Sequence, residues 1–276
     1  MLKSREKDMK SFKCILCLVF IISLYSPLSY AEESIKLGIF PYVSPQKLIK
    51  HQKGLIEHFE LGLKQKISIV TAKSVRKFVE RVRQYKYDIV YSAPHLARYA
   101  EKELGYYPIS MTKHKIQSLF IVPKNSTYKR ISDLKRKKIT MGPPIAIIHQ
   151  IAINKLKKIG LESVRDFTLL TTKTHENAIF SVVNGDSDAG VTGVKLWKNL
   201  APYYKDKLRL LDESIKTTGF ILLAKPNAPK VLVGKFKNLS LSFNDTPAGK
   251  KYLFQGFKEI DKNIVKELDA YTYVFK

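Results

Sequence analysis

The chain has 276 residues, of which 49 are Lys or Arg and 24 are Asp or Glu, so its formal net charge at pH 7 is +25. A charge of this size favours anionic ligands or surfaces through long-range steering. The lysines are scattered, and arginines do not gather among aromatic residues, so we do not expect nucleic-acid binding. A solvated, lysine-rich surface without a specific partner is the alternative explanation of the charge.

The first 31 residues have the pattern of a secretory signal peptide. Five basic residues lead into an apolar run over 14–24, and Ser29-Tyr30-Ala31 is typical of a cleavage site. The apolar run is shorter than the ~20 residues that span a bilayer. Removing the segment, with its five basic and two acidic residues, lowers the net charge from +25 to +22. We expect export to the periplasm, with an uncleaved N-terminal anchor as the alternative.

Both cysteines, Cys14 and Cys17, lie in that segment. The remaining chain therefore has no disulfide, thiolate metal site or cysteine nucleophile. Its length of about 245 residues suits one large domain or two lobes.

Strand and helix patterns alternate along the first part of the exported chain. A helix is expected to begin at Ser44-Pro45, with proline at its first position. The other elements predicted here are strands over 34–40, 66–70 and 87–91 and helices over 74–85 and 95–104. This alternation predicts a parallel sheet with helices on both faces.

A second unit repeats this pattern about a hundred residues downstream, over 174–193. Thr174 is a good helix N-cap, as Ser74 is upstream, and Asn184-Gly185 ends the helix. A buried strand over 189–191 then leads to Thr192, at the strand end where open α/β sheets bind ligands. Two such units predict two similar lobes.

The rest of the chain continues the alternation without a linker rich in Gly, Pro or Ser. The predicted elements are strands over 107–111, 118–122, 138–141, 167–170, 208–211 and 219–224 and helices over 132–134, 146–159, 197–204, 230–238 and 246–254. Two lobes without a linker are expected to be joined by extended segments that cross more than once. The candidates are residues 118–122 and 217–223.

Five motifs in this order resemble one protein family. They are residues 39–45 (IFPYVSP), 87–94 (YDIVYSAP), 131–135 (ISDLK), 174–178 (THENA) with 184–190 (NGDSDAG), and 245–249 (DTPAG). Along nearly all of its exported length the chain resembles the PhnD-like substrate-binding proteins of phosphate- and phosphonate-type ABC importers.

The resemblance implies an α/β fold of the type II periplasmic binding class, with two lobes that close on a ligand cleft. Each lobe would be a mainly parallel sheet flanked by helices. Lobe one would comprise residues 34–117 with 222–276, and lobe two residues 118–221.

The resemblance also implies that Tyr42 and Tyr91 face the ligand from the first lobe, and the Pro143 loop, His175 and Thr192 from the second. The full set of ligand-binding residues that we expect is Tyr42, Tyr91, Ser92, Pro144, Ile145, His149, Thr174, His175 and Thr192. Packing is the structural alternative for the two tyrosines, and His95 and His114 are weaker candidates. Asp188 and Gly185 are expected to be structural, closing the helix-to-strand turn.

One departure from the family concerns the ligand. Where such proteins carry a Ser-Thr-Ser-Gly turn at a helix N-terminus, this chain has Gly142-Pro143-Pro144-Ile145-Ala146, without hydroxyls. Ile116 also stands where a tyrosine is common. His149 is a candidate replacement for the missing donors. We therefore expect a ligand that is larger or less charged than a simple phosphonate, with an apolar part on Ile145.

Enzyme activity is not expected, because GxSxG, HExxH, GxGxxG and P-loop motifs are absent, as are paired histidines at metal-ligand spacing. We expect no cofactor and no bound metal. The partners would be a small anionic ligand and either an ABC permease or, as the alternative, a membrane sensor protein that reads occupancy. We expect a monomer.

Overall fold

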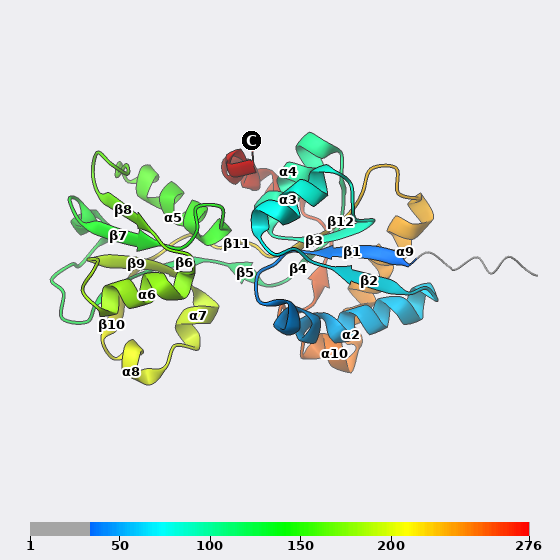
Figure 1. Cartoon of the computed structure of the whole chain (residues 1–276), viewed down its shortest axis with the longest axis horizontal. Helices are drawn as coiled ribbons and strands as arrows, with labels where there is room; N and C mark the ends of the chain where they lie inside the picture. The colour runs from blue at the N-terminus through cyan, green and yellow to red at the C-terminus, as the bar shows by residue number, and fades with distance from the viewer. Residues whose placement is uncertain (1–33, 276) are drawn as a thin grey trace, which may run out of the picture. The chain divides into compact units, whose positions relative to one another are not determined.

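The computed structural model describes residues 34–275, so the predicted signal peptide and both cysteines lie outside the described residues. Ser34–Lys276 forms one compact unit. It contains a six-stranded sheet, a five-stranded sheet and a two-stranded sheet, with helices packed on the larger two (Figure 1). The α/β class predicted from the sequence is confirmed.

The six-stranded sheet has the order β13-β4-β12-β3-β1-β2. Its strands are β1 (Ile35–Ile39), β2 (Ile67–Val70), β3 (Ile89–Ser92), β4 (Tyr107–Thr112), β12 (Ile221–Ala224) and β13 (Phe257–Lys258). Its helices are α2 (Pro45–Leu63), α3 (Val75–Arg83), α4 (Pro94–Leu104) and α9 (Lys230–Ser242). Figure 1 shows α3 and α4 on one face of the sheet and α2 on the other.

The five-stranded sheet has the order β10-β6-β9-β7-β8. Its strands are β6 (Ser118–Pro123), β7 (Lys138–Met141), β8 (Thr168–Thr171), β9 (Ala189–Gly193) and β10 (Leu208–Glu213). Helices α5 (Ile147–Lys158) and α6 (His175–Val183) cover its two faces (Figure 1).

Both large sheets are mixed, which corrects the expectation of mainly parallel sheets. β1 is parallel to β2 and β3, and β7 is parallel to β8 and β9. β12 is antiparallel to β3, however, and β6 is antiparallel to β9. β12 and β6 begin at the sheet edge where β3 and β9 end. Ile221, the first residue of β12, pairs with Ser92, the last residue of β3, and Ser118, the first of β6, pairs with Gly193, the last of β9. A strand that begins where its neighbours end must run against them.

The chain passes between the two large sheets through very short strands. β5 (Lys115–Ile116) precedes β6, and β11 (Thr217–Thr218) precedes β12, and the two pair antiparallel. Two residues carry no readable periodicity, so the sequence patterns did not separate these strands from their neighbours.

Two predicted helices are shorter than expected. The segment predicted over 197–204 forms α7 (Val194–Lys198) and α8 (Pro202–Lys205), because Pro202 lacks an N–H and starts a new helix. The segment predicted over 246–254 is helical only in α10 (Pro247–Lys250). The remaining elements are η1 (Ile131–Leu134), η2 (Phe243–Asp245), α11 (Lys262–Lys266) and η3 (Glu267–Phe275).

The two repeated units, α3 with β3 and α6 with β9, are held by equivalent hydrogen bonds. The side-chain oxygens of Ser74 and Thr174 cap α3 and α6 by accepting the N–H of Lys77 at 3.2 Å and that of Asn177 at 3.1 Å. The carboxylates of Asp88 and Asp188 accept the N–H of Lys36 at 2.8 Å and that of Lys138 at 2.9 Å, each in the neighbouring strand. Asp188 is therefore structural, as the sequence predicted.

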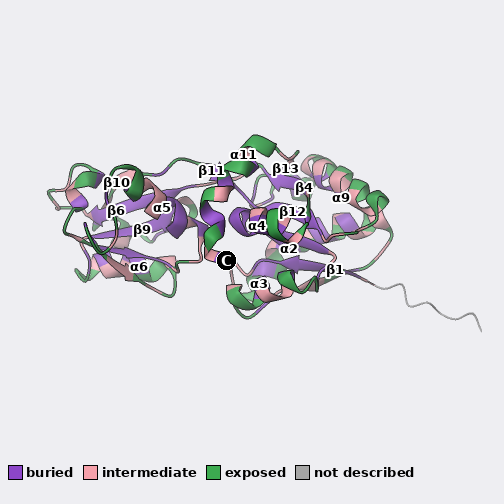
Figure 2. Cartoon of the chain, turned by 90° about the horizontal axis from the view of Figure 1, so that it is seen from above, coloured by how far each residue is buried: buried purple, intermediate pink, exposed green. Residues whose placement is uncertain are grey.

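Figure 2 shows that buried residues concentrate in the strands and that exposed residues lie on the outer sides of helices such as α9. The largest core cluster is built on the six-stranded sheet, and a second lies around β6, β7 and β9. Within residues 34–275, the helices are all too short or too polar to cross a membrane.

Candidate functional site

Ser92 and Thr192 occupy equivalent places at the carboxyl ends of β3 and β9. Both side chains are fully buried. Six buried side-chain polar atoms among the described residues have no hydrogen-bond partner, and these two hydroxyls are among them. Buried polar groups are nearly always satisfied, so two orphans at matching positions need a specific explanation. Both residues were predicted from the sequence to bind ligand.

His175 and His149 meet around Gly142, at the end of β7. The Nδ1–H of His149 donates to the carbonyl of Gly142 at 2.8 Å. A β-carbon on Gly142 would overlap the imidazole of His175, so the ring lies directly against this glycine. Burial, together with the charge of His149, lowers the pKa of His175 to about 4. Burial also lowers the pKa of His149, so both rings are neutral at pH 7.

Nδ1 of His175 is another of the buried atoms without a hydrogen-bond partner. Of the neighbouring predicted residues, Thr174 is exposed and its hydroxyl oxygen accepts the N–H of Asn177, as the cap of α6. Ser92, His175 and Thr192 are thus three predicted residues with unsatisfied polar atoms.

The loop between β7 and α5 packs against the six-stranded sheet. The carbonyl of Ile145 accepts the Nε2–H of His95, in α4, at 2.9 Å. The side chain of Ile145 packs against the core cluster of that sheet, and the carbonyl of the exposed Pro144 accepts from Gln150. The side chain of Ile145 is therefore partly buried, and its predicted contact with an apolar part of the ligand stays a prediction.

Tyr42 heads a chain of hydrogen bonds. Its hydroxyl accepts Nε2–H of Gln52 at 3.1 Å and lies 3.3 Å from Nδ1 of His51. Gln52 in turn accepts the hydroxyl of Tyr252 at 2.7 Å, and that of Tyr91 lies 3.3 Å from Tyr252. Burial raises the pKa of Tyr42 to about 12, so its phenol stays a hydrogen-bond donor. The ring itself is half-buried.

Tyr91 lies in the interior, which agrees with packing, the structural alternative considered for it. Its exposed fraction is 1%. Its ring stacks on Phe220, with centroids 5.0 Å apart and planes 6° from parallel. Alternation along β3 sends the side chains of Tyr91 and Ser92 to opposite faces of the sheet. Phe254, which follows α10, and Phe257 of β13 pack on Tyr91's side.

Phe220 and Phe254 complete an aromatic wall behind Tyr42 that the sequence patterns missed. Their ring centroids lie 5.2 Å and 5.4 Å from that of Tyr42, and 4.9 Å from each other. Phe220 lies between β11 and β12, and Phe254 follows α10, so no local period marks either as a neighbour of Tyr42.

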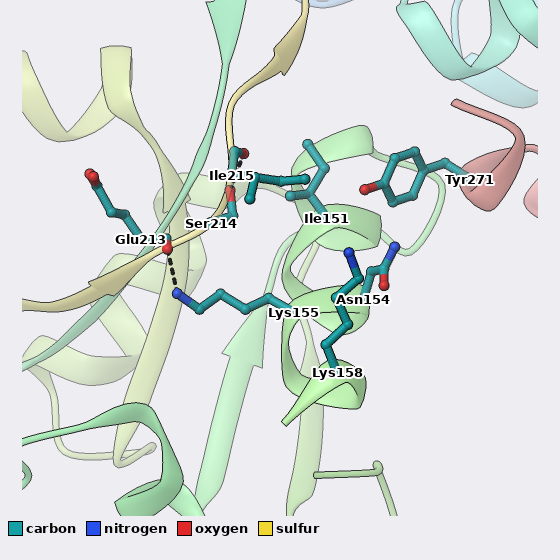
Figure 3. Close-up of a pocket in the computed structure, with 8 residues that line it drawn as sticks. All are labelled: Ile151, Asn154, Lys155, Lys158, Glu213, Ser214, Ile215 and Tyr271. Atoms are coloured by element: carbon teal, nitrogen blue, oxygen red, sulfur yellow. Dashed lines mark hydrogen bonds between the residues drawn. The ribbon is translucent and has the colours of Figure 1, made fainter. Parts of the chain in front are cut away.

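Two surface pockets lie away from these residues. One, of about 260 Å³, is bounded by α5, the segment before β11 and Tyr271 of η3 (Figure 3). Figure 3 shows Lys155 reaching across to the carbonyl of Glu213 at its rim. The other lies at the β6–η1 turn, near Val182 and Lys207. Neither pocket contains a predicted site residue.

In the part of the chain that the structure describes, no group of three or more His, Cys, Asp or Glu is placed to hold a metal ion. The candidate site offers hydroxyls, neutral imidazoles and aromatic rings. Such groups bind by donating hydrogen bonds and by packing.

Comparisons with known structures show the fold. The structure of XAC2383 from Xanthomonas citri bound to ATP superposes with a TM-score of 0.76, at 16% identity over 88% of this chain and 98% of that one. PhnD1 from Prochlorococcus marinus (MIT 9301) in complex with methylphosphonate gives 0.73, at 17% identity over 87% and 97%. The aliphatic sulphonate binding protein SsuA from Escherichia coli gives 0.61, at 17% identity over 88% and 86%.

A comparison with curated proteins finds no match. The family model for the periplasmic substrate-binding protein of phosphonate ABC transporters matches residues 37–263, which is most of the chain. The chain therefore belongs to the family of periplasmic phosphonate-type substrate-binding proteins of ABC transporters.

Proposed function

We propose that this chain is exported to the periplasm, binds one small anion between the carboxyl edges of its two large sheets, and delivers it to an ABC permease. Residues 34–117 with 222–276 would move as one lobe and 118–221 as the other, with β5 and β11 as the hinge. The family is that of a transporter component, which favours delivery over the alternative of a sensing module. The protein would act as a monomer and without chemistry of its own.

The observation that carries this proposal is the pair of orphan hydroxyls of Ser92 and Thr192. A buried donor without a partner costs ~1–3 kcal/mol, and an anionic acceptor removes that cost. Tyr42, a neutral phenol, and His175, with an unsatisfied ring nitrogen, would join them as donors. Tyr91 would act as a positioning residue, because it supports Tyr42 through Tyr252 and Gln52.

The residues near the site favour an anion with a non-ionic part. Pro143 and Pro144 supply no N–H groups, and His149 uses its Nδ1–H on Gly142. Fewer donors remain than a dianionic group needs, although the first turn of α5 still has free N–H groups. The non-ionic part would rest on the partly buried Ile145 and on the wall formed by Tyr42, Phe220 and Phe254.

The proposal is tested by a ligand screen followed by substitution of the two hydroxyls. Inorganic phosphate, methylphosphonate, an aliphatic sulfonate and ATP would be compared by thermal shift, since a ligand at 100 times its Kd stabilises by ~2.7 kcal/mol. For any compound that binds, calorimetry would compare Ser92→Ala and Thr192→Val with the unchanged protein. We expect each substitution to weaken binding roughly tenfold or more, as loss of a hydrogen bond to a charged group does.

Ser110→Ala is the matched control. Ser110 is also a fully buried serine of the same sheet without a hydrogen-bond partner. It pairs with Leu222, which pairs with Tyr91, so its side chain lies on the Tyr91 face of the sheet and not with Ser92. Binding that is unchanged in Ser92→Ala and Thr192→Val, or equally weakened in Ser110→Ala, would contradict the proposed site.

A further inference from the structure

The described chain ends in η3, which is bound to α4 on the six-stranded sheet. Nε of Arg98 donates to Oδ1 of Asp269 at 2.7 Å, and another nitrogen of the same guanidinium donates to Oδ2 at 3.3 Å. The ring of Phe275 lies 4.9 Å from that of His95 and 5.6 Å from that of Tyr99. Arg98, His95 and Tyr99 all belong to α4. η3 is therefore fixed to α4 near its start and at its end.

Between these two anchors η3 contacts α5, which packs on the five-stranded sheet. The hydroxyl of Tyr273 donates to Oε1 of Gln150. Figure 3 shows Tyr271 pointing toward Ile151 and Asn154 of α5. Figure 1 shows the end of the chain between α4 and α5. η3 therefore joins a helix of one large sheet to a helix of the other.

α5 contributes apolar side chains to both core clusters. Ala152 and Leu156 belong to the cluster around β6, β7 and β9. Ile147 and Ile151 belong instead to the cluster built on the six-stranded sheet, as does Tyr271. Ile151 is only 1% exposed. Moving α5 away from η3 would return this apolar surface to water, which is unfavourable.

Hydrogen bonds extend the same contact to the loop between β7 and α5. Nε2 of Gln150 donates to the carbonyl of Pro144, so Tyr273 is linked to this loop through Gln150. His95 donates to the carbonyl of the next residue, Ile145, at 2.9 Å. The side of the six-stranded sheet therefore holds the loop both directly and through one residue of α5. Each of these bonds joins two protein groups and needs no ligand.

We propose that η3, together with His95, is a latch that holds the two lobes together and keeps the β7–α5 loop in place before a ligand binds. A ligand that binds only the closed lobes loses apparent affinity as the closed fraction falls. The latch would therefore raise the affinity of the cleft. Tyr273 is a positioning residue within it, because it reaches the loop only through Gln150. This inference rests on the proposed function, since it concerns closure of the same cleft.

The latch is tested without any ligand, by pulsed electron spin resonance between labels on its two sides. Lys157 of α5 and Lys266 of α11 are exposed, and residues 34–275 contain no cysteine, so Lys157→Cys and Lys266→Cys carry the labels. Tyr273 is 56% exposed, so Tyr273→Phe removes its hydroxyl without disturbing the core. We expect this variant to raise the ratio of long to short label distances roughly two- to tenfold, as loss of one hydrogen bond does. Tyr273→Ala, which also removes the ring, should raise it further.

Tyr107→Phe is the control, since Tyr107 is a tyrosine of the six-stranded sheet that is similarly exposed, at 61%, and lies outside the latch. The inference is overturned if neither Tyr273 variant changes the label distances, or if Tyr107→Phe changes them equally.

Binding measurements separate the latch from the proposed function. For whichever of phosphate, methylphosphonate, the sulfonate or ATP binds, Tyr273→Phe should weaken binding roughly two- to tenfold, in step with the label distances. Ser92→Ala should weaken binding and leave the label distances of the free protein unchanged. If Ser92→Ala and Thr192→Val leave binding unchanged while Tyr273→Phe still separates the labels, the proposed site fails and the latch stands. If they weaken binding while the labels do not respond to Tyr273→Phe, the latch fails and the site stands.

Discussion

Tyr91 lies nearly parallel to Phe220, with ring centroids 5.0 Å apart, so two residues from opposite parts of the chain form one stacked pair. The pair sits among Phe254, Phe257 and Tyr252 in the largest core cluster. Stacked rings of this kind add to the stability that burial itself supplies. Tyr91, which directly precedes the ligand-binding candidate Ser92, is therefore a core residue.

Tyr91→Ala should destabilise the protein by roughly 3–5 kcal/mol, as large-to-small changes of buried aromatic residues do. Tyr91→Phe keeps the ring and loses only the bond to Tyr252, so it should cost about 1 kcal/mol. Urea unfolding followed by circular dichroism measures both. Tyr107→Ala, at an exposed tyrosine, is the control and should change stability little. A Tyr91→Ala protein as stable as this control would show that Tyr91 is not part of the core.

Gly142→Ala should disturb the site without touching the core beneath it. The added methyl group would overlap the ring of His175, so the ring must move or the backbone must shift, at a cost of roughly 1–3 kcal/mol. The matched control is Gly234→Ala, in α9, where a β-carbon meets nothing within 4 Å. Alanine is the better helix former, so this control should gain up to about 1 kcal/mol. Equal stability changes in the two variants, measured by urea unfolding, would refute the close packing of His175 on Gly142.

Asp188→Asn should destabilise the five-stranded sheet by roughly 1–3 kcal/mol. Although burial opposes the shift, the N–H of Lys138 and the hydroxyl of Tyr128 hold the pKa of Asp188 below its usual value. The side chain of Asn has one oxygen that accepts and one NH2 group that only donates, so it cannot accept from both Lys138 and Tyr128. Asp186→Asn, at an exposed aspartate of the same turn, should have little effect. Chemical unfolding of both variants decides whether Asp188 fastens β9 to β7.

His95 should make the protein less stable as the pH falls. Burial lowers the pKa of His95 to about 4, against an unfolded value near 6.5, because a second ring proton on its buried Nδ1 finds no acceptor. The unfolded chain therefore binds the proton first, and stability present above pH ~6.5 is lost as the pH falls toward 4. A shift of this size corresponds to roughly 3 kcal/mol.

The measurement is urea unfolding at several pH values between 7 and 4, compared with His95→Gln. The glutamine keeps an N–H for the carbonyl of Ile145 but does not titrate. The stability of the variant should fall less over this range. Parallel pH profiles for the two proteins would show that His95 is not the titrating group.

The local parts of the fold were readable in the sequence because they depend on neighbours along the chain. Hydrophobic periodicity located most helices and strands, and Ser74 and Thr174 marked the helix starts through their caps. The family resemblance, now confirmed, rested on five such local motifs in one order. The predicted positions of Ser92 and Thr192 at strand ends follow in the same way, since a strand's end is a local property.

Tertiary packing decided what surrounds those strand ends. Tyr42 and Tyr91 both lie at the carboxyl ends of predicted strands and look alike in the sequence. Phe220 and Phe254 pack on both rings, yet Tyr91 is fully buried whereas Tyr42 stays half-exposed. His95 and Ile145 are 50 positions apart, and the hydrogen bond between them exists only once both sheets have formed. Periodicity along a chain shows which side of an element is apolar. Which distant segment covers that side depends on the sum of many long-range contacts, and no single stretch of the sequence contains that information.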